Sequence, residues 1–169
     1  MELSMLSIRP AKASDTSLLV SLINELADFE HLPATVTEAA LLRDGFGERP
    51  KFRVLVAEWN GDPAGYAFFF DYYSTFEGRS GIFLEDIYVR EQYRGRKIGK
   101  ALLAEVAMIA QVGNCFGVRW QVLDWNNPAI EFYRQIGASF LDQWRTISLQ
   151  GKPLERLASS AGNFSLRAQ

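Results

Sequence analysis

The chain has 169 residues, 48% of them hydrophobic and 22% charged, which is the length and composition of one globular domain with a buried core. Its formal net charge of -2 at pH 7 argues against general nucleic-acid binding, and its single cysteine excludes an internal disulfide and fits a reducing compartment. The sequence has no apolar run of membrane-spanning length, no signal-peptide pattern and no metal-ligand spacing, so we expect a cytoplasmic protein without a nucleic-acid, membrane or metal partner.

The first half of the chain predicts alternating strands and helices. Leu6–Arg9 is expected to form a short strand that Pro10 ends. A helix should begin at Ser14 or Asp15 and run to about Phe29, because its apolar residues recur at helical spacing. A second helix, two strands joined by a turn, and a polar loop are then expected at Thr37–Leu42, Phe52–Trp59, Gly65–Tyr73 and Ser74–Gly81.

The segment 82–106 predicts a strand, a basic turn and the start of a helix. Its first part is rich in β-branched and aromatic residues, and its last part is apolar at helical spacing. The turn between them combines glycines with cations: Arg94, Gly95, Arg96, Lys97, Gly99 and Lys100. Unpaired N–H groups and the positive end of the helix dipole would point at this turn, so the segment predicts a phosphate-bearing ligand. The alternative is a plain turn glycine with solvated cations at a helix start.

The remaining elements are shorter. We expect a strand, a short helix with Pro128 in its first turn, a last strand and one helical turn, at Val118–Leu123, 126–137, Trp144–Leu149 and Leu154–Leu157. Residues 158–169 are small and polar and are expected to form a flexible tail. The element order β-α-α-β-β-β-α-β-α-β predicts an α/β (α+β) fold of three layers.

Several separate blocks of the sequence resemble the GNAT superfamily of N-acetyltransferases, most closely its diamine (spermidine/spermine) acetyltransferase branch. The basic turn resembles the acyl-CoA pyrophosphate loop of that family, Arg/Gln-x-x-Gly-x-Gly/Ala, with Arg94 at the first position and Gly99 at the last. Lys97 stands where the family has its middle glycine; in ordinary helical dihedral angles it would keep its N–H available and its ammonium near a phosphate. Further matching blocks, in the same order as in the family, are 25–30, 44–47, 84–89, 124–133 and 137–139.

The resemblance implies a single GNAT domain over residues 1–157. It implies a central mixed, mostly antiparallel sheet with splayed central strands, flanked by helices on both faces, and a homodimer. It also implies acetyl-CoA as co-substrate. The residues matching the family's co-substrate contacts are Ile87, Tyr88, Val89, Arg94, Gly95, Arg96, Lys97, Ile98, Gly99, Lys100, Asn126, Asn127, Pro128, Ala129 and Tyr133.

The same resemblance implies direct acetyl transfer to a primary amine in a ternary complex. Tyr133 matches the general acid that protonates the leaving thiolate, and Glu85 is the candidate base, acting through water. Glu85 and Asp86 should point to opposite faces of a strand, so at most one faces the substrate, and the family match favours Glu85. Without the family context, Tyr133 reads as a half-buried helix residue and Glu85 as an edge-of-sheet charge.

The acceptor is expected to be a small-molecule amine, either a polyamine or diamine or a basic amino acid such as thialysine. Residues that match positions near the family's amine pocket are Phe29, Glu30, Glu85, Arg119, Trp120 and Gln121. If Arg119 faces inward, its charge disfavours a long polyamine and favours an amine that carries a carboxylate. The alternatives are a protein or peptide N-acetyltransferase and a non-catalytic acyl-CoA-binding regulatory module.

Overall fold

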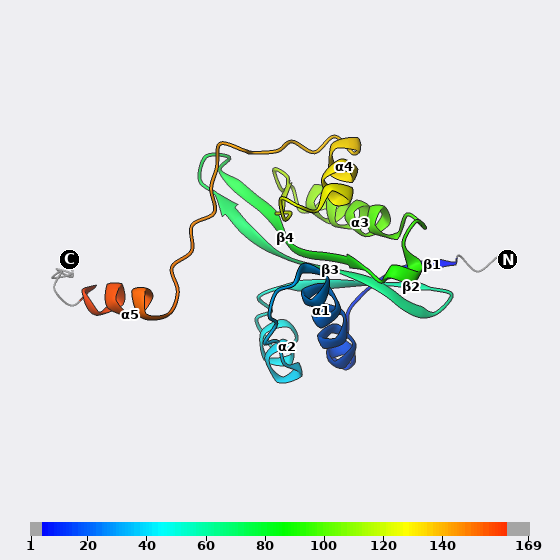
Figure 1. The fold of residues 1–169 in the computed structure, drawn as a ribbon, viewed down its shortest axis with the longest axis horizontal. Coiled ribbons are helices and arrows are strands. Elements are labelled where there is room, and N and C mark those ends of the chain that lie inside the picture. Colours follow the sequence, from blue (N-terminus) through cyan, green and yellow to red (C-terminus); the bar gives the residue numbers. More distant parts are fainter. Residues whose placement is uncertain (1–4, 162–169) are drawn as a thin grey trace. The chain divides into compact units, whose positions relative to one another are not determined.

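A computed structural model describes residues 5–161 of the chain (Figure 1). Its contacts divide the chain into two compact units, residues 1–125 and 126–169. The first unit contains the sheet and most of the predicted site, and the second contains two helices.

The first unit is built on a five-stranded sheet in which the strands follow one another in sequence order. The strands are β1 (Leu6–Pro10), β2 (Arg53–Trp59), β3 (Asp62–Ser74), β4 (Arg79–Val89) and β5 (Val118–Arg119). All neighbours are antiparallel except β4 and β5, which run parallel. The predicted mixed, mostly antiparallel sheet is therefore confirmed. The predicted loop Ser74–Gly81 is too long, because β3 and β4 pair as far as Ser74 and Arg79.

The sheet opens between β4 and β5 because β5 is very short. It pairs with β4 only at Ile82 and Phe83, so residues 84–89 have no strand beside them on that side within the described part of the chain. The predicted strand Val118–Leu123 accordingly ends at Arg119. The result is a stretch of β4 that pairs with β3 on one side and has an open edge on the other.

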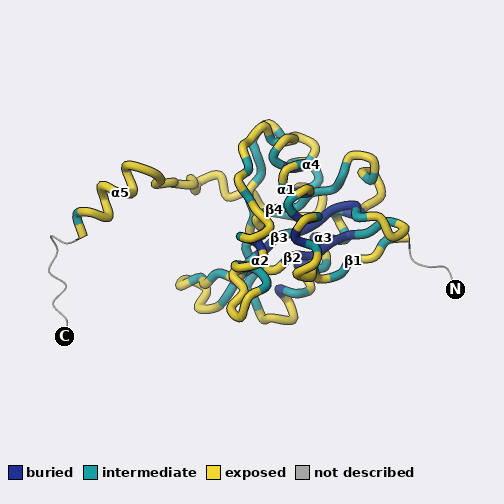
Figure 2. The backbone as a smooth tube through the Cα atoms, turned by 90° about the horizontal axis from the view of Figure 1, so that it is seen from below, coloured by how far each residue is buried: buried dark blue, intermediate teal, exposed yellow. Residues whose placement is uncertain are grey.

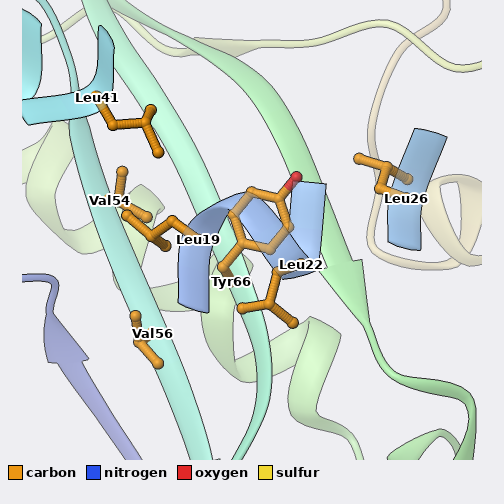
Figure 3. Packing of buried hydrophobic residues seen from close by; sticks show 7 residues of the cluster. All are labelled: Leu19, Leu22, Leu26, Leu41, Val54, Val56 and Tyr66. Carbon is orange, nitrogen blue, oxygen red and sulfur yellow. The ribbon is translucent and has the colours of Figure 1, made fainter. Parts of the chain in front are cut away.

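Helices cover both faces of the sheet in the first unit. Figure 1 shows α1 (Thr16–Glu30) and α2 (Glu38–Gly45) on one face and α3 (Ile98–Val112) on the other. The apolar stripe of α1 is buried against β2 and β3 in a cluster that includes Tyr66 (Figure 3): Leu19, Leu22, Leu26, Leu41, Val54, Val56 and Tyr66. In α3 the buried positions are Ile98, Leu102, Leu103, Val106 and Ala110. Figure 2 shows the buried residues gathered along β2, β3 and β4.

A side-chain cap marks the start of α2 but not that of α1. The Thr37 hydroxyl accepts the N–H of Ala40 at 3.2 Å and so starts α2, as its position in the sequence predicts. Asp15 lies directly before α1, but its carboxylate accepts from the Lys12 N–H and the Arg9 guanidinium instead of capping the helix. Two short 3₁₀ turns, Ala13–Asp15 and Glu91–Tyr93, precede α1 and α3.

The second unit holds α4 (Asn127–Gln135) and α5 (Gly151–Ser159). Asn126 caps α4, and Pro128 lies in its first turn as predicted. The predicted strand Trp144–Leu149 is wrong: this segment has no regular structure, since a strand needs a neighbour to satisfy its backbone. α5 extends beyond the single predicted turn at both ends and is exposed throughout (Figure 2). Most of the predicted tail, residues 162–169, lies outside the described residues.

Candidate active site

A β-bulge in β4 sets the geometry of the carboxylates. Asp86 pairs with Phe68 and Leu84 with Phe69, so Glu85 between them has no partner on β3. A bulge interrupts the alternation of side chains along a strand. As a result Glu85 and Asp86 line the same pocket, and the prediction that they point to opposite faces is wrong.

The pocket that contains both carboxylates has a volume of about 520 Å³. Its other walls come from α1, α2, β3 and the segments that precede α2 and β2: Ile23, Val36, Leu41, Lys51, Phe52, Phe68 and Phe70. Lys51 is the basic residue of this lining, and its ammonium lies 2.6 Å from a carboxylate oxygen of Asp44. The pocket thus combines aromatic walls with two carboxylates, a setting suited to a cation on an alkyl stem.

Asp86 is the more enclosed of the two carboxylates. The Tyr66 hydroxyl donates a hydrogen bond to Asp86 Oδ2 at 3.0 Å. Burial raises the pKa of Asp86 to about 6; the Tyr66 hydrogen bond opposes this rise, and the negative charges of Glu85 and Glu30 add to it. The family match favoured Glu85 over Asp86, and the bulge that brings Asp86 into the same pocket has no signature in the residues around it.

Glu30 and Phe29 end α1 and lie beside different parts of the site. Burial raises the pKa of the Glu30 carboxyl, and its charge contributes to the raised pKa values of Asp86 and Tyr66. The Phe29 ring lies 5.9 Å from the ring of Trp125 and 4.9 Å from the Arg94 guanidinium. The end of α1 therefore links the acidic pocket to the basic turn.

The basic turn is held in place by packing of its arginines. Arg94 donates to the carbonyl oxygen of Val89 at 3.0 Å and stacks on Phe29 and on Tyr88. The Arg96 guanidinium lies 5.0 Å from the Trp59 ring. Both side chains remain exposed, and both residues lie just before the start of α3.

Lys97 departs from the expected backbone. It is the residue before α3 and has φ 62° and ψ 13°, which is the left-handed region and not the helical one. Gly95 also has a positive φ, of 76°, as a turn glycine often does. Lys97 thus takes up the conformation that glycine favours while its ammonium stays exposed at the helix start. Ile98 is buried behind it, and Gly99 and Lys100 follow in the first turn of α3.

Arg119 lies on the pocket face of the sheet. Its guanidinium is 5.2 Å from the Phe116 ring and 5.9 Å from the Tyr72 ring. Tyr72 lies two residues after Phe70 in β3, so both side chains point to the same face of the sheet. Phe70 lines the pocket, and its ring stacks on that of Phe83 with 5.4 Å between the ring centres. The pocket carboxylates and the Arg119 guanidinium therefore lie at opposite ends of a row formed by the aromatic side chains of Phe70 and Tyr72. Trp120 and Gln121 follow β5 and are half-buried and exposed, respectively.

The remaining predicted site residues belong to the second unit. Tyr133, on α4, is 7% exposed, and its ring lies 5.4 Å from that of Phe132. Asn126, Asn127, Pro128 and Ala129 form the capped start of α4, where Asn126 Oδ1 accepts the Ala129 N–H at 3.4 Å. The first unit brings together Glu85, Asp86 and the pocket, and the second unit carries Tyr133.

The splayed sheet, the glycine-containing basic turn at the start of α3 and the acidic pocket define an acyltransferase fold of the kind the sequence predicts. Residues 19–138 match the acetyltransferase (GNAT) family, and the chain belongs to that family. It is an acetyl-CoA-dependent N-acetyltransferase.

Known proteins agree with this assignment. The thialysine N-epsilon-acetyltransferase of Sus scrofa is 40% identical over 164 residues, which cover 89% of this chain and 96% of that protein. The spermidine/spermine N(1)-acetyltransferase-like protein 1 of Homo sapiens is 36% identical over 78% of this chain and 20% of its own length. An integron cassette protein from V. cholerae superposes with a TM-score of 0.79 at 24% identity, over 94% of this chain and 100% of that one, and so shares the fold. Within residues 5–161, no helix is long and apolar enough to cross a membrane.

Proposed function

We propose that the chain acetylates the side-chain amine of a basic amino acid or of a closely related small diamine. The observation that carries this proposal is the pair of carboxylates, Glu85 and Asp86, in one aromatic-walled pocket with Glu30 close enough to affect the Asp86 pKa. An alkylamine is mostly ammonium at neutral pH, and this concentration of negative charge attracts it.

The donor is proposed to lie across the start of α3 and the open edge of β4. The first-turn N–H groups of α3 and the exposed cations Arg94, Arg96, Lys97 and Lys100 suit a pyrophosphate. The open edge of β4 at Ile87–Val89 suits the amides of a pantetheine arm, which would pair with it like a strand. Residues Asn126–Ala129 would contact the lower part of acetyl-CoA.

The chemistry requires a base for the acceptor and an acid for the thiolate. We propose a carboxylate of the acidic pocket on the acceptor side, for which the family match points to Glu85 acting through water, and the Tyr133 hydroxyl on the leaving-group side. The neutral amine then attacks the thioester carbonyl carbon, the C–S bond breaks, and the sulfur takes a proton. Phe29, Trp120 and Gln121 are proposed to shape the acceptor pocket.

Arg119 favours an acceptor that carries a carboxylate. It has no ion-pair partner among the described residues and lies at the opposite end of the Phe70–Tyr72 row from the acidic pocket. An ω-amino acid would place its ammonium at the carboxylates and its own carboxylate at Arg119. Two relatives have names that fit this acceptor class: the thialysine N-epsilon-acetyltransferase of Sus scrofa and an L-ornithine N5-acetyltransferase of Arabidopsis thaliana, 42% identical over 94 residues.

An acceptor panel tests this proposal. Release of the CoA thiol would be measured with lysine, thialysine and ornithine, with their decarboxylated counterparts, with spermidine and with lysine-containing peptides. We expect turnover with the amino acids, and a loss of about 10-fold or more in their kcat/KM in Arg119→Gln, with little change for the diamines.

Arg49→Gln removes an exposed guanidinium from the loop before β2 and serves as the matched control. Turnover of peptides or of spermidine alone would contradict the acceptor class. No turnover with any amine, together with retained acetyl-CoA binding, would point instead to a non-catalytic acyl-CoA-binding module.

We further propose a homodimer that acts in the cytoplasm. Apolar side chains of the second unit are exposed in and near the segment that precedes α5: Phe140, Leu141, Trp144, Ile147 and Leu149. Exposed apolar residues gathered in one segment are typical of an interaction site. The single cysteine and the small net charge fit a cytoplasmic location.

A further inference from the structure

The Tyr66–Asp86 hydrogen bond joins the core of the first unit to the acidic pocket. Tyr66 has no exposed surface and belongs to the hydrophobic cluster, where Figure 3 shows its ring beside Leu22 and its hydroxyl pointing away from Val56. That hydroxyl donates to Asp86 Oδ2 at 3.0 Å. A buried tyrosine hydroxyl needs a hydrogen-bond partner, and the partner in this fold is a pocket carboxylate.

This contact fixes both the orientation and the ionisation of Asp86. The rigid core holds the Tyr66 ring, so its hydroxyl can aim one carboxylate oxygen while the other stays available to the pocket. Donation to the ionised carboxylate also stabilises its charged form, against the opposing effects of burial and of the charges on Glu85 and Glu30.

We propose that Asp86 is a second carboxylate of the acceptor site, that it takes the proton of the acceptor ammonium, and that Tyr66 is its positioning residue. This inference rests on the proposed function, and it moves the basic role from Glu85 to its neighbour. Glu85 then acts mainly by attracting the ammonium, because its side chain is exposed at the bulge, where it has no partner residue on β3.

Proton transfer to Asp86 leaves the atoms and charges of the reaction balanced. One N–H bond of the ammonium breaks, and an O–H bond forms on Asp86. The nitrogen lone pair then attacks the thioester carbonyl carbon, and the C–S bond breaks. A second N–H proton leaves as the intermediate collapses and ends on the departing sulfur. Asp86 returns its proton to solvent, so the products are the amide and the thiol, and nothing is oxidised or reduced.

The charged groups around Asp86 suit this role. Tyr66 faces it from β3, Glu85 from the bulge and Glu30 from the end of α1, while Lys51 across the pocket is paired with Asp44. The net result is a pKa for Asp86 of about 6, close to neutral pH, and a base is most effective when its pKa lies near the pH at which it acts.

The test is the pH dependence of kcat/KM for the acceptor that the panel identifies, in wild-type protein and in Tyr66→Phe. Wild-type kcat/KM should fall as the pH decreases through about 6, because Asp86 becomes protonated. Removing the Tyr66 hydroxyl raises the pKa of Asp86, so the acid limb of Tyr66→Phe should move to higher pH. Tyr73→Phe, which changes a 63% exposed tyrosine of the same strand, should keep the wild-type profile.

Two amide variants separate the neighbouring carboxylates. Asp86→Asn should lower kcat by about 100-fold or more, and Glu85→Gln should mainly raise the acceptor KM. Acetyl-CoA binding and the melting temperature check that each variant is folded. An unshifted acid limb in folded Tyr66→Phe, or a larger kcat loss in Glu85→Gln than in Asp86→Asn, would overturn the inference. A wild-type protein that acetylates no amine would instead refute the proposed function itself.

Discussion

Burial of Asp86 makes the acidic pocket a destabilising feature at neutral pH. The pKa of this carboxyl is raised from its usual 3.8 to about 6 in the folded chain, mainly by burial. A folded-state pKa above the unfolded one means that the protonated group favours folding: the stabilisation is complete below about pH 4 and is lost as the pH rises through about 6. The difference corresponds to roughly 3 kcal/mol of unfolding free energy.

Asp86→Asn should therefore be more stable than wild type in mildly alkaline solution, by up to about 3 kcal/mol, and the difference should shrink as the pH falls. The asparagine keeps an oxygen that accepts from Tyr66, so the hydroxyl stays paired. Urea unfolding at roughly pH 8 and pH 5 measures this. A variant that is less stable than wild type at the higher pH would show that burial of the ionised carboxylate does not destabilise the fold.

Tyr133 provides the second prediction at the scale of single residues. Tyr133→Phe removes the hydroxyl proposed to protonate the thiolate and keeps the ring, which is almost fully buried. We expect kcat to fall by about 100-fold or more with little change in acetyl-CoA binding. Thiol release under saturating substrate measures the loss, with Tyr73→Phe as control. Unchanged turnover would remove Tyr133 from the chemistry.

At the scale of elements, the strain at the start of α3 lies in one residue. Lys97 adopts left-handed angles, which cost a non-glycine residue about 1–2 kcal/mol. Lys97→Gly should relieve this strain, partly offset by the greater chain entropy of glycine, and so raise the unfolding free energy by about 0.5–1 kcal/mol. Urea unfolding of the variant and of wild type measures the difference.

Lys97→Ala is the matched control, because it removes the same ammonium and keeps a Cβ in the strained position. Equal stability of the glycine and alanine variants would contradict the strain argument. Acetyl-CoA titration of both variants measures the separate effect of the charge: if the ammonium contacts a phosphate, both should bind more weakly than wild type to a similar degree.

At the scale of the whole molecule, the second unit carries the prediction about assembly. We expect the wild-type chain to elute and scatter light as a dimer. Replacing two exposed apolar residues in Trp144→Ser/Ile147→Ser should shift it toward the monomer, because the apolar area buried on association is reduced. Gln143→Ser, at an exposed polar position in the same segment, should stay dimeric. A wild-type monomer over the measured concentration range would refute the homodimer.

Parts of the site that depend on local interactions could be predicted from the sequence, and parts that depend on long-range interactions could not. The turn Arg94–Gly99 and the start of α4 at Asn126 were readable from short patterns, because caps, glycines and cations act on neighbouring residues. The bulge at Glu85 was not readable, because it exists only in the pairing between β3 and β4. Tyr66 and Asp86 are 20 residues apart, and nothing in either neighbourhood joins them.

The sequence alone therefore determined the family, the helices α1 to α4, the order of the first four strands and the basic turn, since periodicity, capping and local composition fix them. Tertiary structure decided that β5 stops at Arg119, that Trp144–Leu149 forms no strand, that Lys97 adopts a glycine-like backbone, and that two adjacent carboxylates share one pocket. Each of these depends on which distant backbone or side chain lies alongside, and that information is absent from any short stretch of residues.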